Sequence, residues 1–141
     1  MTLVDTSVLV RFLDPDPSFR GKARAAIAQR LADGVPLCVC AQCLIEFWAV
    51  ATRPQSANGL GMSLEVALSE VEGFEQMLTL LPEPDDIFVR WKRLVVEIGV
   101  HGKAVHDSRI VALMESHGVE RILTLNPGDF SRYPGIQVEA L

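Results

Sequence analysis

The chain has 141 residues, of which 49% are hydrophobic and 22% are charged, and its formal net charge is −5 at pH 7. This length predicts a single domain over residues 1–141, and the balanced composition excludes an intrinsically disordered chain. No apolar run approaches the roughly 18 residues of a membrane-spanning helix, and the N-terminus lacks the basic start of a signal peptide, so we expect a cytoplasmic protein with no membrane contact.

Short apolar runs alternate with longer helical patterns along the chain. The short runs indicate buried strands of a parallel sheet at residues 3–4, 37–40, 77–81, 122–125 and 136–138. Helices are expected at about 18–33, 42–53, 63–75, 85–98 and 104–117, and most of them end at Gly or Pro. The alternation predicts an α/β fold, a three-layer α/β/α sandwich around a central, mainly parallel five-stranded sheet.

Asp5 directly follows the first expected strand and precedes Thr6 and Ser7. In open parallel sheets, ligands bind beyond the carboxyl ends of the strands, which makes Asp5 a candidate site residue. The alternative is that Asp5 only caps the helix that follows.

The three cysteines, Cys38, Cys40 and Cys43, lie within six residues of one another. A zinc site would need a fourth ligand nearby, and no second Cys pair or His pair follows at ligand spacing. An odd cysteine count also argues against a disulfide framework. We interpret all three as small buried side chains in a strand and at the start of the next helix.

Two helices carry a carboxylate where the pattern is otherwise apolar. Glu46 is surrounded in sequence by apolar residues, and an ionised carboxylate there is costly unless it is paired or binds a cation. Asp107 shares an apolar helix stripe with Ile110 and Val111. The alternatives are that a distant Arg pairs with Glu46, and that Asp107 only complements the dipole of its helix.

The net charge is unevenly distributed along the chain. Residues 54–89 contain seven acidic side chains and no Lys or Arg, whereas the segments on either side each carry +1. The acidic segment is expected to form a solvated face or to contact a basic partner. The negative total therefore does not exclude RNA, and phosphate contacts are possible for the basic side chains of the first segment: Arg11, Arg20, Lys22, Arg24, Arg30 and Arg53.

Asp129 lies in the loop that leaves the fourth expected strand, where Asp is also an ordinary turn residue. An α/β sheet would bring Asp5, Glu46, Asp107 and Asp129 to one edge without an obvious set of basic partners. Clustered carboxylates repel one another unless a divalent cation neutralises them, and oxygen ligands suit Mg²⁺, or alternatively Mn²⁺, better than zinc. This pattern favours metal-assisted phosphodiester hydrolysis.

The chain resembles PIN-domain proteins and, within that family, the VapC-type toxins of toxin–antitoxin pairs. The resemblance spans essentially all 141 residues and lies in five segments: LVDTSVLV, CLIEFWAVATRP, NGLGMS, AVHDSRIVALMESHGV and ILTLNPGDFSRYPGIQV. It implies a PIN-like fold and the toxin component of a type II toxin–antitoxin system.

The resemblance also implies an activity, that of a Mg²⁺-dependent endoribonuclease that hydrolyses RNA through a carboxylate-bound metal and an activated water. Asp5, Glu46 and Asp107 would be the metal-binding acids, with Asp129 as the fourth. Thr124 and Asn126 match the polar pattern around the fourth acid, although many relatives have Asp where this chain has Asn126. Thr6 or Ser7 would orient a water. The implied partners are RNA, a small antitoxin that inserts an Arg among the acids, and a second copy in a homodimer.

Other functions remain open on the sequence. An aspartyl phosphatase would have a second Asp two positions after the first, where this chain has Ser7. A receiver domain would have paired acids at the first strand and a positioned Lys. A non-catalytic RNA-binding or regulatory PIN-like domain is the remaining alternative, and its expected mark is the loss of one or more of the four acids.

Overall fold

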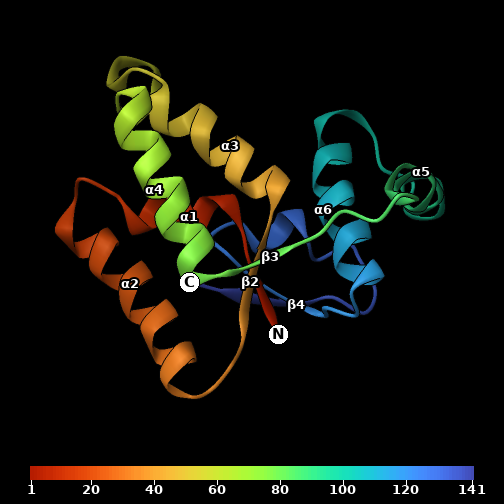
Figure 1. Ribbon diagram of the computed structural model, residues 1–141. Coiled ribbons are helices and arrows are strands. Elements are labelled where there is room, and N and C mark those ends of the chain that lie inside the picture. Colours follow the sequence, from red (N-terminus) through yellow and green to blue (C-terminus); the bar gives the residue numbers. More distant parts are fainter.

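The computed structural model describes residues 1–141 and contains one five-stranded sheet with helices on both faces (Figure 1). The strands are β1 (Thr2–Val4), β2 (Leu37–Cys40), β3 (Thr79–Leu81), β4 (Arg121–Thr124) and β5 (Gln137–Ala140). The helices are α1 (Thr6–Phe12), α2 (Pro17–Ala32), α3 (Ala41–Thr52), α4 (Leu64–Met77), α5 (Ile87–Ile98) and α6 (Val105–Ser116). Short 3₁₀ turns lie at η1 (Gln55–Ala57), η2 (Gly102–Ala104) and η3 (Pro127–Asp129).

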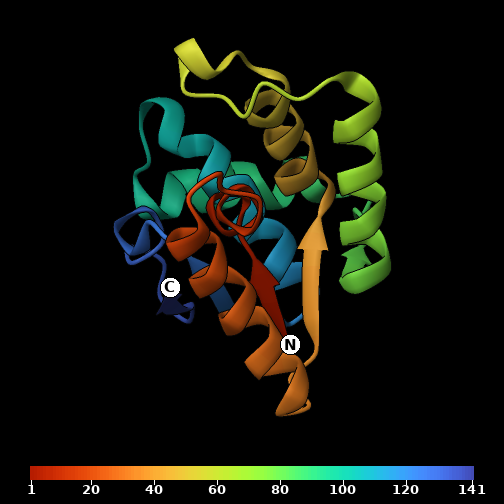
Figure 2. The ribbon, with the colours of Figure 1, turned by 90° about the vertical axis from the view of Figure 1, so that its left-hand side faces the viewer.

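All five strands are parallel, in the order β3-β2-β1-β4-β5. Leu3 in the central strand lies opposite Cys38 of β2 on one side and Ile122 of β4 on the other. Figure 2 shows β1 and β2 side by side and pointing the same way, with α1 directly beyond the end of β1. The predicted α/β class with a five-stranded sheet is confirmed.

The helices form the two outer layers. The four helices α1 to α4 lie on one face of the sheet, and α5 and α6 pack together on the other (Figure 1). From β1 the chain moves outward to β2 and β3, then returns through α5 and α6 to β4 on the opposite side of β1. The direction of winding therefore reverses between β1 and β4, and their carboxyl ends meet at the point where α/β sheets bind ligands.

Helices on both faces bury almost every residue of the inner strands. Every residue of β2 is buried, as are Leu3 and Val4 of β1. Cys38, Cys40 and Cys43 are buried free thiols, in agreement with their interpretation as small core side chains. None of the helices is both long enough and apolar enough to cross a bilayer.

Two details of the sequence prediction were wrong. The pattern missed α1, because its apolar residues continue the apolar character of β1 and are too few to establish a helical period. Met77 was assigned to a strand, but it is the last residue of α4, and the Leu78 amide still donates to the Phe74 carbonyl. Only Thr79–Leu81 pair with β2, so β3 is a short edge strand.

Candidate active site

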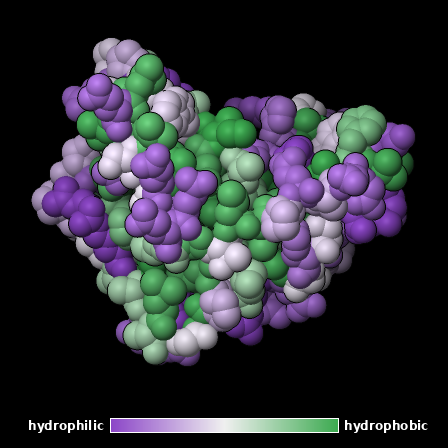
Figure 3. Space-filling model, in the orientation of Figure 1, coloured by the Kyte–Doolittle hydropathy of each residue, from purple (hydrophilic) through white to green (hydrophobic).

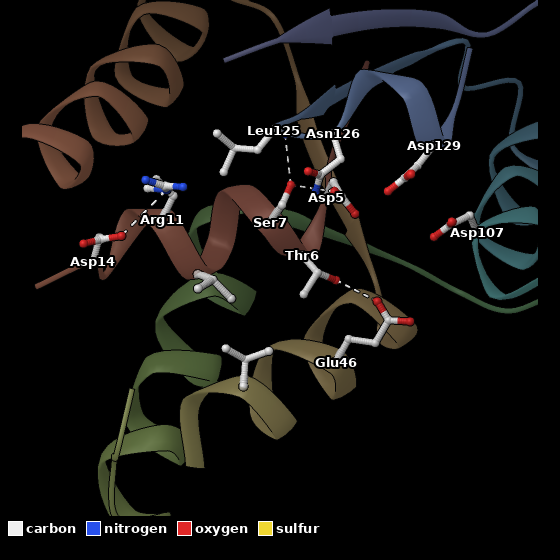
Figure 4. Close-up of a pocket in the computed structure, with 12 residues that line it drawn as sticks. Asp5, Thr6, Ser7, Arg11, Asp14, Glu46, Asp107, Leu125, Asn126 and Asp129 are labelled. Carbon is white, nitrogen blue, oxygen red and sulfur yellow. Dashed lines mark hydrogen bonds and ion pairs between the residues drawn. The ribbon is translucent and has the colours of Figure 1, made fainter. Parts of the chain in front are cut away.

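The four acids singled out in the sequence line one cavity of about 420 Å³ at the carboxyl edge of the sheet (Figure 4). Asp5 follows β1, Glu46 lies in the second turn of α3, Asp107 lies in the first turn of α6, and Asp129 ends η3 after β4. The cavity is also lined by three of the predicted supporting residues: Thr6, Ser7 and Asn126. Four segments that are distant in sequence thus contribute acidic side chains to one place.

Asp5 is buried, and two hydroxyls fix its carboxylate. Ser7 Oγ donates to Asp5 Oδ2 at 2.6 Å, and Thr124 Oγ1 donates to the same oxygen at 2.7 Å. Ser7 Oγ in turn accepts the Leu125 amide at 3.0 Å, which ties α1 to the end of β4. Asp5 occupies the N-cap position of α1, but its side chain makes no capping hydrogen bond, so the capping alternative is wrong.

Glu46 is held by neutral donors on both of its oxygens. Thr6 Oγ1 donates to Oε2 at 3.0 Å, and Gln42 Nε2 donates to Oε1 at 3.0 Å. No ion pair in the structure includes Glu46, so the alternative of a structural Arg partner is also wrong. The carboxylate is oriented while its charge is left uncancelled.

The pKa of Asp107 reflects its burial and the negative charge of the cavity. Its pKa is raised from the ordinary 3.8 to about 6, first because burial disfavours the charged form and then because Asp129, Asp5 and Glu46 repel it. Arg132 lowers this pKa, but it forms no ion pair with any acid. Because the other three acids all act on Asp107, the four carboxylates belong to one electrostatic cluster.

The corner formed by the β4–β5 loop combines exposed and buried groups. Asp129 and Asn126 are exposed, whereas Thr124 is fully buried and does not line the cavity. Thr124 Oγ1 accepts the Asn126 amide at 3.0 Å while it donates to Asp5. Thr124 therefore connects the loop that carries Asp129 to the carboxylate at the end of β1.

The donor set suits a hard divalent cation. None of the four acids forms an ion pair, and their oxygens are the ligands that Mg²⁺ and Mn²⁺ prefer. No group of three or more His, Cys, Asp or Glu side chains forms a ready-made metal cage. Mg²⁺ is usually bound by one or two carboxylates and keeps several waters, so an open arrangement of separate acids fits this ion.

The basic side chains proposed for RNA differ in their surroundings. Arg11 lines the cavity, 3.7 Å from Asp14 and with its guanidinium over the Phe19 ring. Arg30 forms an ion pair with Glu139 at 2.7 Å, which accounts for its charge structurally. Arg24 donates to the Phe12 carbonyl at 3.0 Å. Of these, Arg11 is the one basic side chain that borders the acidic cluster.

Two further residues contact the site and were not among the predicted site residues. Asp14 lines the cavity beside Arg11, and nothing in the sequence marked it, because it lies beyond the end of α1, where helical spacing does not apply. Gln42 donates to Glu46 from the preceding turn of α3, and its i,i+4 spacing was the corresponding signal.

Comparisons with known proteins agree with this architecture. "Ribonuclease VapC48" from Mycobacterium tuberculosis is 25% identical over 136 residues, which are 95% of this chain and 92% of that protein. Among solved structures, VapBC2 from Rickettsia felis bound to a promoter DNA fragment matches with a TM-score of 0.71 at 15% identity, covering 99% of this chain and 98% of that one. DNA-bound VapBC from Salmonella typhimurium matches with a TM-score of 0.66 at 21% identity, with 99% and 98% coverage.

The PIN domain family matches residues 2–136, a range that contains β1 to β4, all six α-helices and all four acids of the cavity. Because this match extends over nearly the whole chain, the chain belongs to the PIN domain family.

Proposed function

We propose that this PIN domain protein is the toxin of a type II toxin–antitoxin system and acts as a Mg²⁺-dependent endoribonuclease in the cytoplasm. The observation that carries the proposal is the cluster of four carboxylates, Asp5, Glu46, Asp107 and Asp129, that share one cavity without an ion-pair partner. Uncompensated carboxylates destabilise a fold, so their convergence favours a role in binding a cation.

Each of the cavity residues would have a distinct role in binding the cation or orienting water. Asp5 and Glu46 are held in fixed orientations by hydroxyl and amide donors and would bind the cation. Asp107 and Asp129 would complete the site from the opposite side of the cavity, where Figure 4 shows both side chains directed inward. Ser7 and Thr6 would orient a water from the α1 side. A divalent cation bound there would activate water and offset the negative charge that develops on the phosphoryl group.

RNA is the substrate class that the available observations favour. The Mycobacterium tuberculosis relative is named a ribonuclease, and Arg11 lies at the border of the cavity, where a phosphate of the bound strand would pass. All four acidic positions are filled in this chain, which speaks against the alternative of a non-catalytic RNA-binding or regulatory domain.

Cleavage of total cellular RNA with and without Mg²⁺ tests the activity, with Asp5→Asn as the decisive variant. An Asn side chain can place Oδ1 where Asp5 Oδ2 accepts the Ser7 and Thr124 hydroxyls, so the fold should be kept while the cavity gains an amide. We expect wild-type cleavage to require Mg²⁺ and to fall by at least about 100-fold in Asp5→Asn.

Asp33→Asn is the matched control, because Asp33 is an exposed carboxylate at the end of α2 and does not line the cavity. It should cleave like the wild type. A fully active Asp5→Asn variant would overturn the proposal. RNA binding by the wild-type chain without any cleavage in Mg²⁺ or Mn²⁺ would instead identify the non-catalytic alternative.

An antitoxin and a second copy of the chain are the proposed protein partners. The similar folds in the Rickettsia and Salmonella structures are those of VapBC assemblies, which supports a cognate antitoxin. Apolar atoms gather in the hollow between the α3–α4 side and the α5–α6 side (Figure 3). Several large apolar side chains are exposed on α3, α4 and β3, which is typical of an interface: Ile45, Leu64, Val66, Leu68 and Leu80.

Light scattering of the purified chain tests the homodimer, and co-purification with the product of the neighbouring reading frame tests the antitoxin. Ile45 is 68% exposed beside an apolar groove that also contains Leu44, Trp48 and Val71, so Ile45→Glu should weaken an interface on this face. Leu31→Glu on α2 is the control, because Leu31 is exposed and does not line that groove. A monomer that captures no antitoxin would contradict both partners.

A further inference from the structure

Gln42, in the first turn of α3, contacts both helices that supply acids to the cavity. Its Nε2 donates to Glu46 Oε1 at 3.0 Å and to the His106 carbonyl at 2.8 Å. Its Oε1 lies 3.4 Å from Arg109 Nη1, which donates to it. His106 immediately precedes Asp107 in α6. One side chain therefore connects the carboxylate on α3 to the backbone that carries the carboxylate on α6.

The chemistry of the amide suits this position. A primary amide has two N–H groups, so it can donate to Glu46 and to the His106 carbonyl at the same time while its oxygen accepts from Arg109. A carboxylate at this position would place a second negative charge about 3 Å from Glu46 and would have no proton for either acceptor. A reversed amide would direct its oxygen at two acceptors, so the contacts also determine its orientation.

Gln42 is the hydrogen-bonded link between α3 and α6. Every hydrogen bond between these two helices has Gln42 as one partner. The two helices lie on opposite faces of the sheet (Figure 1), and Gln42 at the start of α3 bridges them. Without this link, the separation of Glu46 and Asp107 would depend on the packing of each helix against its own face.

The link is anchored at its outer end. Arg109, also on α6, makes two parallel hydrogen bonds of 2.9 Å each to Glu83, in the connection between β3 and α5. Bidentate pairs of this kind have a defined geometry in addition to their charge. Arg109 is therefore held in place by Glu83 while it reaches Gln42 with the same Nη1 atom.

We propose that Gln42 is a positioning residue that sets Glu46 relative to Asp107 and thereby determines how tightly the cavity binds a divalent cation. This inference rests on the proposed function, because it assumes that the acid cluster is a cation site. Groups that orient metal-binding carboxylates affect affinity strongly, and their loss commonly weakens metal binding by about 10- to 100-fold.

The test measures Mn²⁺ binding to the purified chain by calorimetry, in the absence of RNA. Gln42→Met keeps the length of the side chain but removes both N–H donors and replaces the amide oxygen by a weakly accepting sulfur. We expect the Mn²⁺ dissociation constant to rise about 10-fold or more, with little change in the melting temperature in EDTA. In RNA cleavage, the loss of rate should be recovered at high Mn²⁺ concentration, which a general defect in folding would not allow.

Gln29→Met is the matched control. Gln29 Nε2 donates to Asp33 Oδ1 at 2.9 Å, so it is another Gln bonded to an acid four residues later, but it lies on α2 outside the cavity. Mn²⁺ binding should be unchanged in this variant. Wild-type affinity in Gln42→Met, or an equal loss in Gln29→Met, would overturn the inference about Gln42.

Glu83→Gln provides a second variant that leaves α3 and α6 intact. It removes the ion pair that holds Arg109, at a side chain that is 37% exposed, so folding should be preserved. We expect a smaller loss of Mn²⁺ affinity, about threefold, because the effect passes through Arg109 to Gln42. Unchanged affinity in both Glu83→Gln and Gln42→Met would overturn the inference, whereas failure of the wild type to bind Mn²⁺ would overturn the proposed function as well.

Discussion

Hydroxyl and amide groups, and no cationic side chains, hold the carboxylates of Asp5 and Glu46 in place. Asp5 accepts from Ser7 and Thr124, and Glu46 accepts from Thr6 and Gln42. Neutral donors orient a carboxylate without cancelling its charge. Two acids outside the site, Glu83 and Glu139, each form an ion pair with an arginine. The ion pair with Arg109 lowers the pKa of Glu83. The chain thus separates acids that stabilise the surface from acids that remain available to a cation.

Asp107→Asn should stabilise the metal-free protein at neutral and alkaline pH. The pKa of Asp107 is about 6 in the folded chain and near 3.8 when the chain is unfolded, so ionisation above pH 6 costs folding free energy. We expect the variant to gain about 1 kcal/mol in free energy of unfolding at pH 8, allowing for partial solvent screening. Urea unfolding in EDTA measures this gain.

The direction in which stability changes with pH tests whether the raised pKa of Asp107 causes this gain. Between pH 3.8 and about 6 the folded state binds more protons than the unfolded state, so the wild type loses stability as the pH rises through this range. The advantage of Asp107→Asn should therefore be largest above pH 6 and disappear near pH 4. An advantage that grows toward acidic pH would contradict the raised pKa.

Thr124→Val should destabilise the fold by about 1 to 3 kcal/mol, because it removes two hydrogen bonds made by a buried hydroxyl. The buried hydroxyl donates to Asp5 at 2.7 Å and accepts the Asn126 amide at 3.0 Å, and Val supplies neither contact. Denaturant unfolding provides the measurement. Thr79→Val, at an exposed position of the edge strand β3, should change stability by less than about 0.5 kcal/mol. Equal effects of the two substitutions would argue against a role for the Thr124 hydroxyl.

Acids that interrupt an apolar pattern could be recognised from the sequence one at a time, whereas Asp129 was recognised only through its position after the fourth expected strand. Glu46 and Asp107 interrupt apolar helical patterns, so each was recognisable alone. Asp129 occupies a turn where Asp is ordinary, and only the return of the chain from β4 to the edge of the sheet brings it to the cavity. Gln42 and Arg109 carry no local signal of a shared role, because their contacts join residues 67 positions apart.

At the scale of elements, the C-terminal end of α3 depends on a close return of the chain. The segment after η1 runs back along the helix, with the Leu60 amide bonded to the Val50 carbonyl and the Met62 amide to the Ala51 carbonyl. Gly59 is the point of closest approach, since a Cβ there would lie 2.0 Å from the Arg53 carbonyl oxygen. Val50 also lines the cavity, so this return supports the wall of the site.

Gly59→Ala should therefore destabilise the protein by about 1 to 3 kcal/mol, because the backbone of Arg53 must shift to admit the methyl group. Gly73→Ala provides the contrast. Gly73 lies exposed in α4 with open space at its Cβ position, so Ala should add about 0.5 to 1 kcal/mol of stability. Thermal unfolding of both variants gives the comparison, and a tolerated Gly59→Ala would show that the return loop has more freedom than its contacts imply.

How accurately each helix or strand was predicted depended on its length and on how deeply it is buried. The long helices and the buried central strands were recovered within a few residues, because a strong period or an apolar run marks each of them. The seven-residue α1 was missed, since its sequence continues the apolar run of β1. The edge strand β3 was predicted too long at its start, where hydrogen bonding from α4 continues to Leu78.

For the molecule as a whole, the negative charge lies in two separate regions. Residues 54–89 contribute seven acids, but no residue of that segment lines the cavity. The cavity acids come instead from residues 1–53 and 90–141, each of which has a net charge of +1. Basic residues in these two segments therefore offset the cavity acids in the net charge. The sheet topology concentrates them, because the winding reverses between β1 and β4 and brings both flanks to the same edge.

If the four acids bind a cation as proposed, this concentration of charge makes the stability of the fold depend on that cation. A ligand that binds only the folded state at 100 times its dissociation constant adds about 2.7 kcal/mol, which for a domain of this size raises the melting temperature by about 5 to 10 °C. We expect Mn²⁺ to produce such a rise over EDTA in the wild type, and Asp5→Asn to lose most of it. NaCl at matched ionic strength is the control, because it screens the repulsion of the four acids without binding among them. An equal rise in NaCl, or a full Mn²⁺ response in Asp5→Asn, would mean that the carboxylates respond to screening alone and do not bind the ion.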